Sequence, residues 1–137
     1  MKANRVMSVD VTSVPPELKL AEAYTLMQQL RVRHLPVVSE GRLCGILSNR
    51  DTLFHATRKL DGAPQFPDVT VSEVMSRSPI SCKVGTSIPQ LAGLMADHRI
   101  DSVPVVTDEG ELLGLVTSRD LLEVLRNAKL DDELSFN

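Results

Sequence analysis

The feature that most constrains this chain of 137 residues is an internal repeat. The triplet Val6-Met7-Ser8 recurs as residues 74–76, and Pro36-Val37-Val38 recurs as residues 104–106, both at an offset of 68 residues. After one extra residue in the second copy the offset becomes 69, and 16 of the 48 residues from 6 to 53 are identical in both copies. A period of about half the chain predicts two copies of one structural unit.

Each copy predicts the same order of elements: strand, helix, strand, strand, helix. In the second copy, Ser87 and Gln90 form a capping box around Pro89, which marks a helix start. The first copy predicts a helix at about 19–30, strands at 34–38 and 43–47, and a helix from about 49. The second predicts a short strand at 79–82, a helix to about 98, strands at 102–106 and 112–116, and a helix from about 118. The apolar stripe of that last helix consists of Leu121, Leu122 and Leu125.

These elements predict an α+β fold of two β-α-β-β-α units related by an approximate two-fold axis. The expected bounds are residues 1–62 for the first unit, 63–70 for a linker and 71–137 for the second unit. The linker follows from the glycine and prolines between residues 61 and 68. A unit of this size with one small sheet leaves part of that sheet uncovered, so we expect the two units to pack as one module.

Composition disfavours several functions. The net charge is -3 and the sequence pI about 5.6, and one Tyr, three Phe and no Trp offer few rings for stacking on bases, so we expect no nucleic-acid binding. Neither Cys44 nor Cys82 belongs to a Cys-x-x-Cys pair, and the three histidines lack metal-ligand spacing. Without an apolar run or secretory signal, we expect no membrane span and a cytoplasmic protein. Residues 131–133 are expected to be a solvated acidic end.

The most informative segment closes each copy. Residues 45–51 read Gly-Ile-Leu-Ser-Asn-Arg-Asp, and residues 114–120 read Gly-Leu-Val-Thr-Ser-Arg-Asp. A hydroxyl three residues before Asp is a helix cap and needs no further function. The same group offers a hydroxyl and an arginine to a phosphate and a carboxylate to ribose hydroxyls. Its recurrence on matching elements favours ligand binding.

Each copy also begins with a Val-Met-Ser triplet, which we call its head, and contains a Pro-Val-Val strand. With these features and the closing motifs, the chain resembles a tandem pair of cystathionine-beta-synthase (CBS) domains, also called a Bateman module. The resemblance covers about residues 5–128. It implies a stand-alone regulatory module without chemistry of its own, which binds AMP, ADP, ATP or S-adenosylmethionine in clefts between its units, forms homodimers and signals to an unidentified partner protein by changing conformation. A ligand-free dimerisation scaffold is the alternative, and a small phosphohydrolase is the weaker one, because no nucleophile, base and metal set is apparent.

The resemblance also implies roles for individual residues. Asp51 and Asp120 would bind ribose, Ser48 and Thr117 would approach phosphate, and Arg50 and Arg119 are additional candidates. The adenine would lie near residues 12–14 and 80–82, which include Thr12, Ile80 and Ser81, and near Val32 and Ile100, held between aliphatic side chains.

One pair of positions distinguishes the copies. Arg33 and His34 stand where family members often place basic residues facing phosphate, whereas the second copy has Asp101 and Ser102 there. A carboxylate repels phosphate, so we expect unequal clefts: one strong site, or one that prefers a less charged ligand. Alternatively, Arg33 and Asp101 form a structural ion pair across the pseudo-two-fold axis, and neither contacts ligand.

Overall fold

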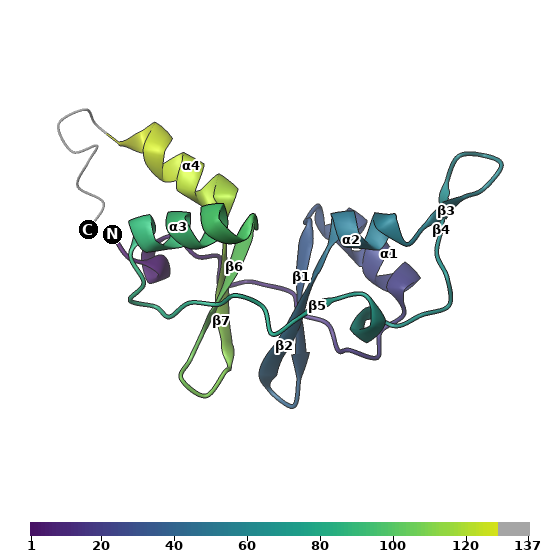
Figure 1. Ribbon diagram of the computed structural model, residues 1–137, viewed down its shortest axis with the longest axis horizontal. Helices are drawn as coiled ribbons and strands as arrows, with labels where there is room; N and C mark the ends of the chain where they lie inside the picture. The colour runs from purple at the N-terminus through teal and green to yellow at the C-terminus, as the bar shows by residue number, and fades with distance from the viewer. Residues whose placement is uncertain (129–137) are drawn as a thin grey trace. The chain divides into compact units, whose positions relative to one another are not determined.

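The structure is a computed structural model that describes residues 1–128 (Figure 1). The chain forms two compact units: Thr12–Pro79 is one, and Met1–Val11 with the chain from Ile80 onward is the other. Both units contain helices and small antiparallel sheets, and the α+β prediction is confirmed. Within the described residues, no helix is both long enough and apolar enough to cross a membrane. The acidic segment at residues 131–133 lies outside them.

The unit Thr12–Pro79 is built on a three-stranded antiparallel sheet in the order β1-β2-β5. Val14 adds one parallel bridge to Val37 at the other edge of β1. Its elements are α1 (Leu20–Leu30), β1 (His34–Ser39), β2 (Arg42–Ser48), α2 (Asn49–Phe54), β3 (Thr57–Arg58), β4 (Pro64–Gln65), the 3-10 helix η2 (Val71–Glu73) and β5 (Ser76–Arg77). The two helices and the two strands between them that are predicted for the first copy are confirmed to within a residue or two, whereas its leading strand is reduced to the bridge at Val14.

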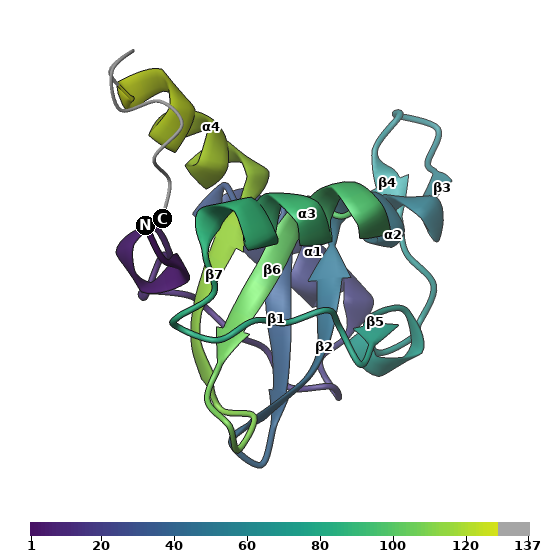
Figure 2. The same cartoon turned by 60° about the vertical axis from the view of Figure 1, so that its left-hand side comes forward.

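The other unit has the antiparallel pair β6-β7, with α3 beside it and α4 starting where β7 ends (Figure 2). Its elements are η1 (Ala3–Arg5), α3 (Ile88–His98), β6 (Ser102–Val106), β7 (Leu112–Thr117) and α4 (Ser118–Asn127). The capping box of Ser87 and Gln90 is present at the start of α3. The strand expected at residues 79–82 is reduced to a single parallel bridge from Cys82 to Val105, because only this residue reaches the edge of β6.

Each unit has its own apolar core, and matched helices line the two cores. Leu20, Ala23 and Met27 of α1 are fully buried, at the spacing that puts them on one face of the helix. Leu91 and Met95 of α3 occupy the corresponding face in the other core. Methionine recurs at two matched pairs of positions, 7 with 75 and 27 with 95. Packing accounts for this, since Met27, Met75 and Met95 are buried and Met7 packs against the second core.

The Val-Met-Ser heads explain why the compact units do not coincide with the sequence copies. Ser76 pairs with Ile46 of β2, and a Cβ atom on Gly45 would lie 2.9 Å from the carbonyl oxygen of Ser76. The first head makes the same contact with the other half of the chain: Ser8 bridges to Leu115. The head of each copy thus completes the sheet of the other copy. This division differs from the expected bounds of 1–62 and 71–137.

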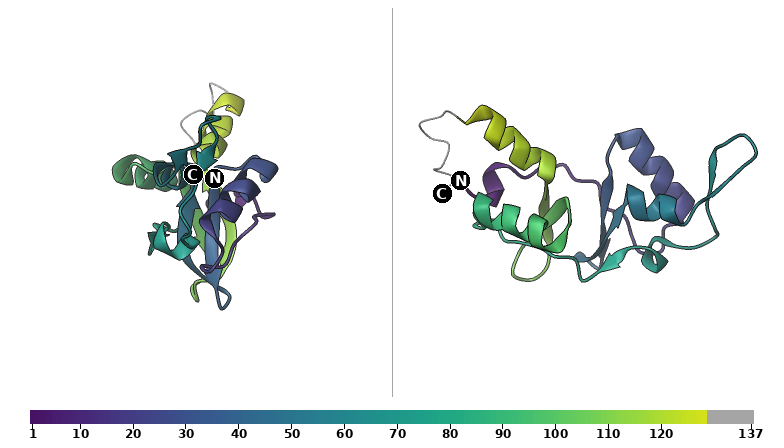
Figure 3. Two further views of the ribbon diagram at one scale, coloured as in Figure 1. Left: turned by 90° about the vertical axis from the view of Figure 1, so that its right-hand side faces the viewer. Right: turned by 45° about the horizontal axis from the view of Figure 1, so that its top comes forward.

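Residues 63–70, expected to be a linker, are an ordered part of the unit Thr12–Pro79. Their first residues pair with β3 in a hairpin, drawn extending from α2 in Figure 3. Further along, the N–H of Leu20 donates to the carbonyl oxygen of Val69 at 2.9 Å, and Lys19 forms a 2.8 Å ion pair with Asp68. The hydrogen bond and charge of Lys19 lower the pKa of Asp68. Proline and glycine mark turns here without interrupting the unit.

The apolar stripe predicted for the last helix is only partly buried. Leu121 packs against the core of its unit, but Leu122 and Leu125 are 63% and 57% exposed. The sequence pattern correctly indicates an amphipathic helix. It does not indicate that two of the three leucines face away from the unit's own core.

Candidate functional site

The first candidate site lies where β2 ends and α2 begins. Ser48 caps the helix: its hydroxyl oxygen accepts the backbone N–H of Asp51 at 3.0 Å. The hydroxyl of Thr52 donates to the carbonyl oxygen of Ser48 at 2.8 Å and fixes the same turn from its buried side. The sequence Ser-x-x-Asp produces this cap because the Ser oxygen satisfies a backbone donor that has no partner within the helix.

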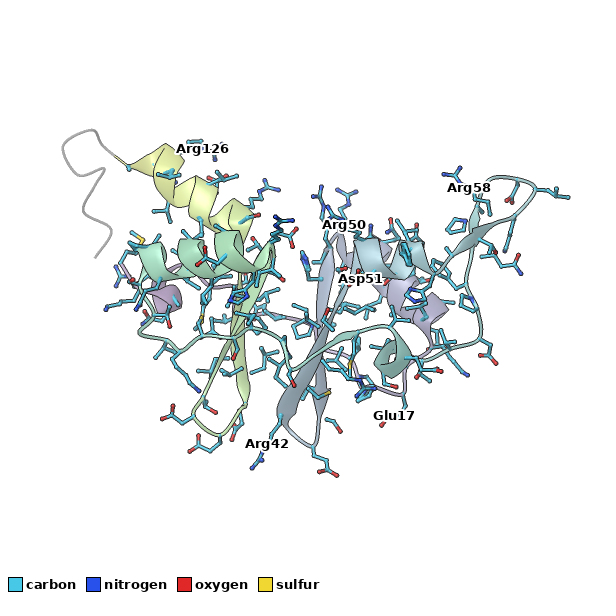
Figure 4. The ribbon with its side chains drawn as sticks, in the orientation of Figure 1. Glu17, Arg42, Arg50, Asp51, Arg58 and Arg126 are labelled. Atoms are coloured by element: carbon cyan, nitrogen blue, oxygen red, sulfur yellow. The ribbon has the colours of Figure 1, made fainter. Side chains whose placement is uncertain are left out.

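The carboxylate of Asp51 is available in this arrangement. The side chain is half-buried, and its carboxylate has no hydrogen bond or ion pair with any other residue among 1–128. Arg50, its neighbour, is exposed at the start of the helix (Figure 4). A carboxylate can accept hydrogen bonds from two vicinal hydroxyls, and a guanidinium can hold a phosphate.

Two basic residues lie beside this turn. The carbonyl oxygen of Arg33 accepts the N–H of Asn49 at 2.8 Å, which holds residue 33 next to the helix start. His34 pairs with Ser48 in the register of the two strands. We name the group Arg33, His34, Ser48, Arg50 and Asp51 the Asp51 site.

The second candidate site has the same backbone arrangement at the start of α4. The N–H of Ser118 donates to the carbonyl oxygen of Asp101 at 2.9 Å, and Ser102 pairs with Thr117. The hydroxyl of Thr117 accepts the N–H of Asp120 at 3.4 Å. We name the group Thr117, Arg119 and Asp120 the Asp120 site.

The two sites differ at the carboxylate. One oxygen of Asp120 accepts the backbone N–H of Thr117 at 2.8 Å and its hydroxyl at 3.2 Å, so the carboxylate completes a capping box. No such box forms between Asp51 and Ser48 in the described part of the chain. For Asp120, the structure therefore shows the capping role that the sequence left as one of two alternatives.

The remaining candidates are distributed between the same two units. Thr12 and Val32 belong to the unit of Asp51. Thr12 is exposed and stands two residues before Val14, whose backbone forms hydrogen bonds with β1. Val32 follows the end of α1. Ile80, Ser81 and Ile100 belong to the unit of Asp120. Arg33 and Asp101 lie in different units, so the ion pair between them stays a prediction.

The two cysteines are free thiols, and neither belongs to a named site. Burial raises the pKa of the Cys82 thiol, which disfavours the reactive thiolate. Burial likewise raises the pKa of Cys44, whose thiol donates to the carbonyl oxygen of Val37 at 3.4 Å. Within residues 1–128, no three His, Cys, Asp or Glu side chains converge as metal ligands would.

The sequence interpretation overlooked one contact. It treated the motif glycines and the Val-Met-Ser heads as separate signatures, whereas Gly114 packs against Met7, and Gly45 against Met75. The recurrence of both motifs in each copy was the available signal. It shows that the motifs recur together, but it does not show which copy of one contacts which copy of the other.

Known proteins match this chain over most of its length. The family model described as "CBS domain" matches residues 3–56 and 71–127. The CBS domain-containing protein YhcV of Bacillus subtilis is 39% identical over 116 residues, which are 84% of this chain and 79% of YhcV. An inosine-5'-monophosphate dehydrogenase of Korarchaeum cryptofilum is 38% identical over 114 residues, 82% of this chain but only 22% of that enzyme.

A solved structure shows the same fold. The CBS domain pair of protein MJ0100, determined in complex with 5'-methylthioadenosine and S-adenosyl-L-methionine, is 25% identical to this chain. The match has a TM-score of 0.81 and covers 94% of this chain and 98% of that one. The repeat, the fold and the family model therefore agree.

Proposed function

This chain belongs to the CBS domain family, and on that premise we propose that it is a regulatory module that binds an adenosyl ligand: AMP, ADP, ATP or S-adenosylmethionine. One observation carries the proposal: a hydroxyl, an arginine and an aspartate open a helix at matched positions in two units. The carboxylate suits ribose hydroxyls and the arginine suits phosphate. The ligands of the MJ0100 domain pair support the adenosyl class.

The proposed regulation is thermodynamic linkage. A ligand present at a hundred times its dissociation constant stabilises the form that binds it by about 2.7 kcal/mol. If two conformations of the module differ in ligand affinity, that free energy shifts their populations. A partner protein that contacts only one conformation then reads the ligand concentration.

A thermal-shift screen tests ligand binding. The compounds are AMP, ADP, ATP, S-adenosylmethionine and NAD, each tested on the unmodified chain and on Asp51→Ala and Asp120→Ala. At a hundredfold excess over its dissociation constant, the true ligand should raise the melting temperature by roughly 5–15 °C. At least one Ala variant should lose most of that shift. The control is Asp97→Ala, an exposed aspartate of α3 outside both sites, which should keep it.

Two results would contradict the proposal. Melting that is independent of all five compounds would favour the ligand-free scaffold. Turnover of an added nucleotide would favour an enzyme. We propose binding without catalysis because Asp51 and Asp120 are equivalent residues of separate units, and an acid and base pair needs two groups positioned at one reacting centre.

We further propose that the chain acts as a homodimer. The support is the exposed leucine pair on α4, Leu122 and Leu125, since apolar side chains grouped on one helix face favour burial against another surface. The same leucines are the observation that favours a scaffold as the second candidate function. The two functions are compatible, and only the ligand screen distinguishes a sensing dimer from a structural one.

A further inference from the structure

The methionines of this chain differ in how far solvent can reach them. Met27, Met75 and Met95 are buried, with 0%, 8% and 7% of their surface exposed, whereas Met1 is 42% exposed. Met7 is half-buried, and its side chain also packs against the core of its unit. Met7 therefore combines access from solvent with a packed position in a repeat head.

The sulfur of Met7 lies directly against β7. A Cβ atom on Gly114 would lie 2.8 Å from Met7 Sδ and 3.0 Å from its Cγ, so the thioether occupies the space beside this glycine. The next residue, Ser8, exchanges two backbone hydrogen bonds with Leu115, at 3.0 and 3.1 Å. The side chain of Met7 and the backbone of Ser8 together hold the first head on β7.

The chain that follows this head gives it little support. Residues 9–13 make no backbone hydrogen bond with any other residue among 1–128, and Val9 is 66% exposed. The bond pair at Ser8 is therefore the last attachment before the chain passes into the unit Thr12–Pro79. Attachments at the end of a segment open at a low free-energy cost compared with the core of a unit.

Oxidation of Met7 changes the chemistry of this contact. A methionine thioether is apolar and adaptable, whereas its sulfoxide is polar and chiral. The sulfur is the contacting atom, so the added oxygen lies at the contact and needs hydrogen bonds from water. Water reaches that oxygen more easily when the head separates from Gly114, so the sulfoxide favours separation.

The two cysteines are the other sulfur atoms that a peroxide can oxidise, and a cysteine reacts as its thiolate. Burial raises the pKa of Cys82 and of Cys44, which keeps the thiolate fraction small near neutral pH. A thioether carries no acidic proton, so the reaction of Met7 does not depend on such an ionisation.

We propose that Met7 is a site of reversible oxidation by peroxides, and that its sulfoxide releases the first head from Gly114 and Leu115. A lone pair on the sulfur attacks one oxygen of hydrogen peroxide, and the S–O bond forms as the O–O bond breaks. The proton of the transferred oxygen passes to the leaving hydroxide, which departs as water. Sulfur is oxidised by two electrons and the peroxide is reduced by two.

Methionine sulfoxide reductases reverse this step, with one enzyme for each sulfoxide epimer. The sulfoxide oxygen leaves as water, and two thiols are oxidised to a disulfide as the thioether forms again. The modification can therefore act as a switch.

Release of the head reaches the turn at the start of α4. Leu115 stands two residues before Thr117, whose hydroxyl caps that helix. Without the first head, β7 loses the backbone neighbour that is bonded to it at Leu115. Oxidation of Met7 is thereby coupled to the order of the Asp120 site.

Peroxide treatment of the full chain, followed by peptide mass mapping and hydrogen exchange, tests the proposal. Dithiothreitol is added after the peroxide, because it reverses the sulfenic acids and disulfides of cysteine but not methionine sulfoxide. Met7 should be oxidised about 10-fold faster than Met75, the buried methionine of the second head. With Met7 oxidised, the amides of Ser8 and Leu115 should exchange about 10-fold faster, whereas that of Val14, bonded to the carbonyl oxygen of Pro36, should change less than about 3-fold.

Met7→Leu removes the sulfur and keeps an apolar side chain of similar volume. In this variant, peroxide should change exchange at Ser8 and Leu115 less than about 3-fold. The matched control is Met1→Leu, which removes a more exposed sulfur and should respond to peroxide as the unmodified chain does. An equal response of Met7→Leu and the unmodified chain would overturn the proposal.

Measurements on the unmodified chain cover the case in which Met7→Leu does not fold. Treatment of the oxidised chain with both reductases should restore slow exchange at Ser8 and Leu115, and failure to do so would contradict a reversible switch. Unchanged exchange with Met7 fully oxidised, or oxidation of Met75 as fast as that of Met7, would also overturn the proposal. These measurements use no ligand, so their failure leaves the proposed function standing.

Discussion

Replacing Gly45 with Ala tests how the repeat heads complete each unit. A Cβ atom at this position would lie 2.9 Å from the backbone carbonyl oxygen of Ser76, and it would also overlap the side chain of Met75. The methionine can change rotamer, but the carbonyl belongs to β5 and is held by pairing with β2. The strands must therefore separate locally, or the added methyl group must remain in a contact that folded proteins avoid.

The expected loss of stability follows from two opposing contributions. Overpacking of this kind destabilises by about 1–3 kcal/mol. The backbone at Gly45 does not have a positive φ, so Ala is conformationally compatible and restricts the unfolded chain, which returns about 0.4–1 kcal/mol. The midpoints of the two ranges give a net loss of about 1.3 kcal/mol. Gly114→Ala should behave alike, since its Cβ would lie 2.8 Å from the carbonyl oxygen of Ser8.

Urea unfolding followed by far-ultraviolet circular dichroism measures these effects. Gly93→Ala is the matched control, because this glycine lies inside α3 and a Cβ there would meet nothing within 4 Å. It should gain about 0.8–1 kcal/mol from helix propensity alone. If Gly45→Ala is as stable as the unmodified chain with an unchanged denaturant slope, the packing argument is wrong.

Two further predictions concern the helix starts and the exposed leucines. Without ligand, Asp120→Ala should reduce the free energy of unfolding by about 1 kcal/mol more than Asp51→Ala does, because only Asp120 completes a capping box. Equal losses of stability in urea unfolding would contradict this difference between the sites. In size-exclusion chromatography with light scattering, Leu122→Glu should shift a dimer toward monomer, whereas Leu60→Glu at the exposed β3–β4 turn should not. A monomeric unmodified chain, or a dimer insensitive to Leu122→Glu, would refute the α4 interface.

The secondary structure was largely predictable because its signals are local. The capping box at Ser87, the apolar spacing of α1 and α3, and the two hairpins each depend on residues a few positions apart. The expectation of a linker rested on the same kind of local signal. Proline and glycine between residues 61 and 68 indicate turns, but only the bond from Leu20 to Val69 shows that the segment returns to its own unit.

The candidate sites were predictable as residue types and positions but not as chemical states. Recurrence identified Ser48, Asp51, Thr117 and Asp120, and the structure puts them at matched helix starts. Both copies contain the same capping pattern, so this pattern does not show which carboxylate is engaged in the cap. The engagement of Asp120 and the availability of Asp51 depend on side-chain conformation, which the shared motif does not specify.

By itself, the amino-acid sequence determined that the chain is a duplicated α+β unit with a hydroxyl, an arginine and an aspartate at matched positions. Residue identity and hydrophobic periodicity are properties of the linear sequence, so no tertiary contact was needed to find them. Only the tertiary structure decided that each Val-Met-Ser head completes the other copy's sheet, and which leucines of α4 remain exposed. Those outcomes depend on contacts between residues far apart in the sequence. A glycine in a strand leaves room for another backbone to approach closely. Its place in the sequence does not say which segment approaches, and the fold determines that.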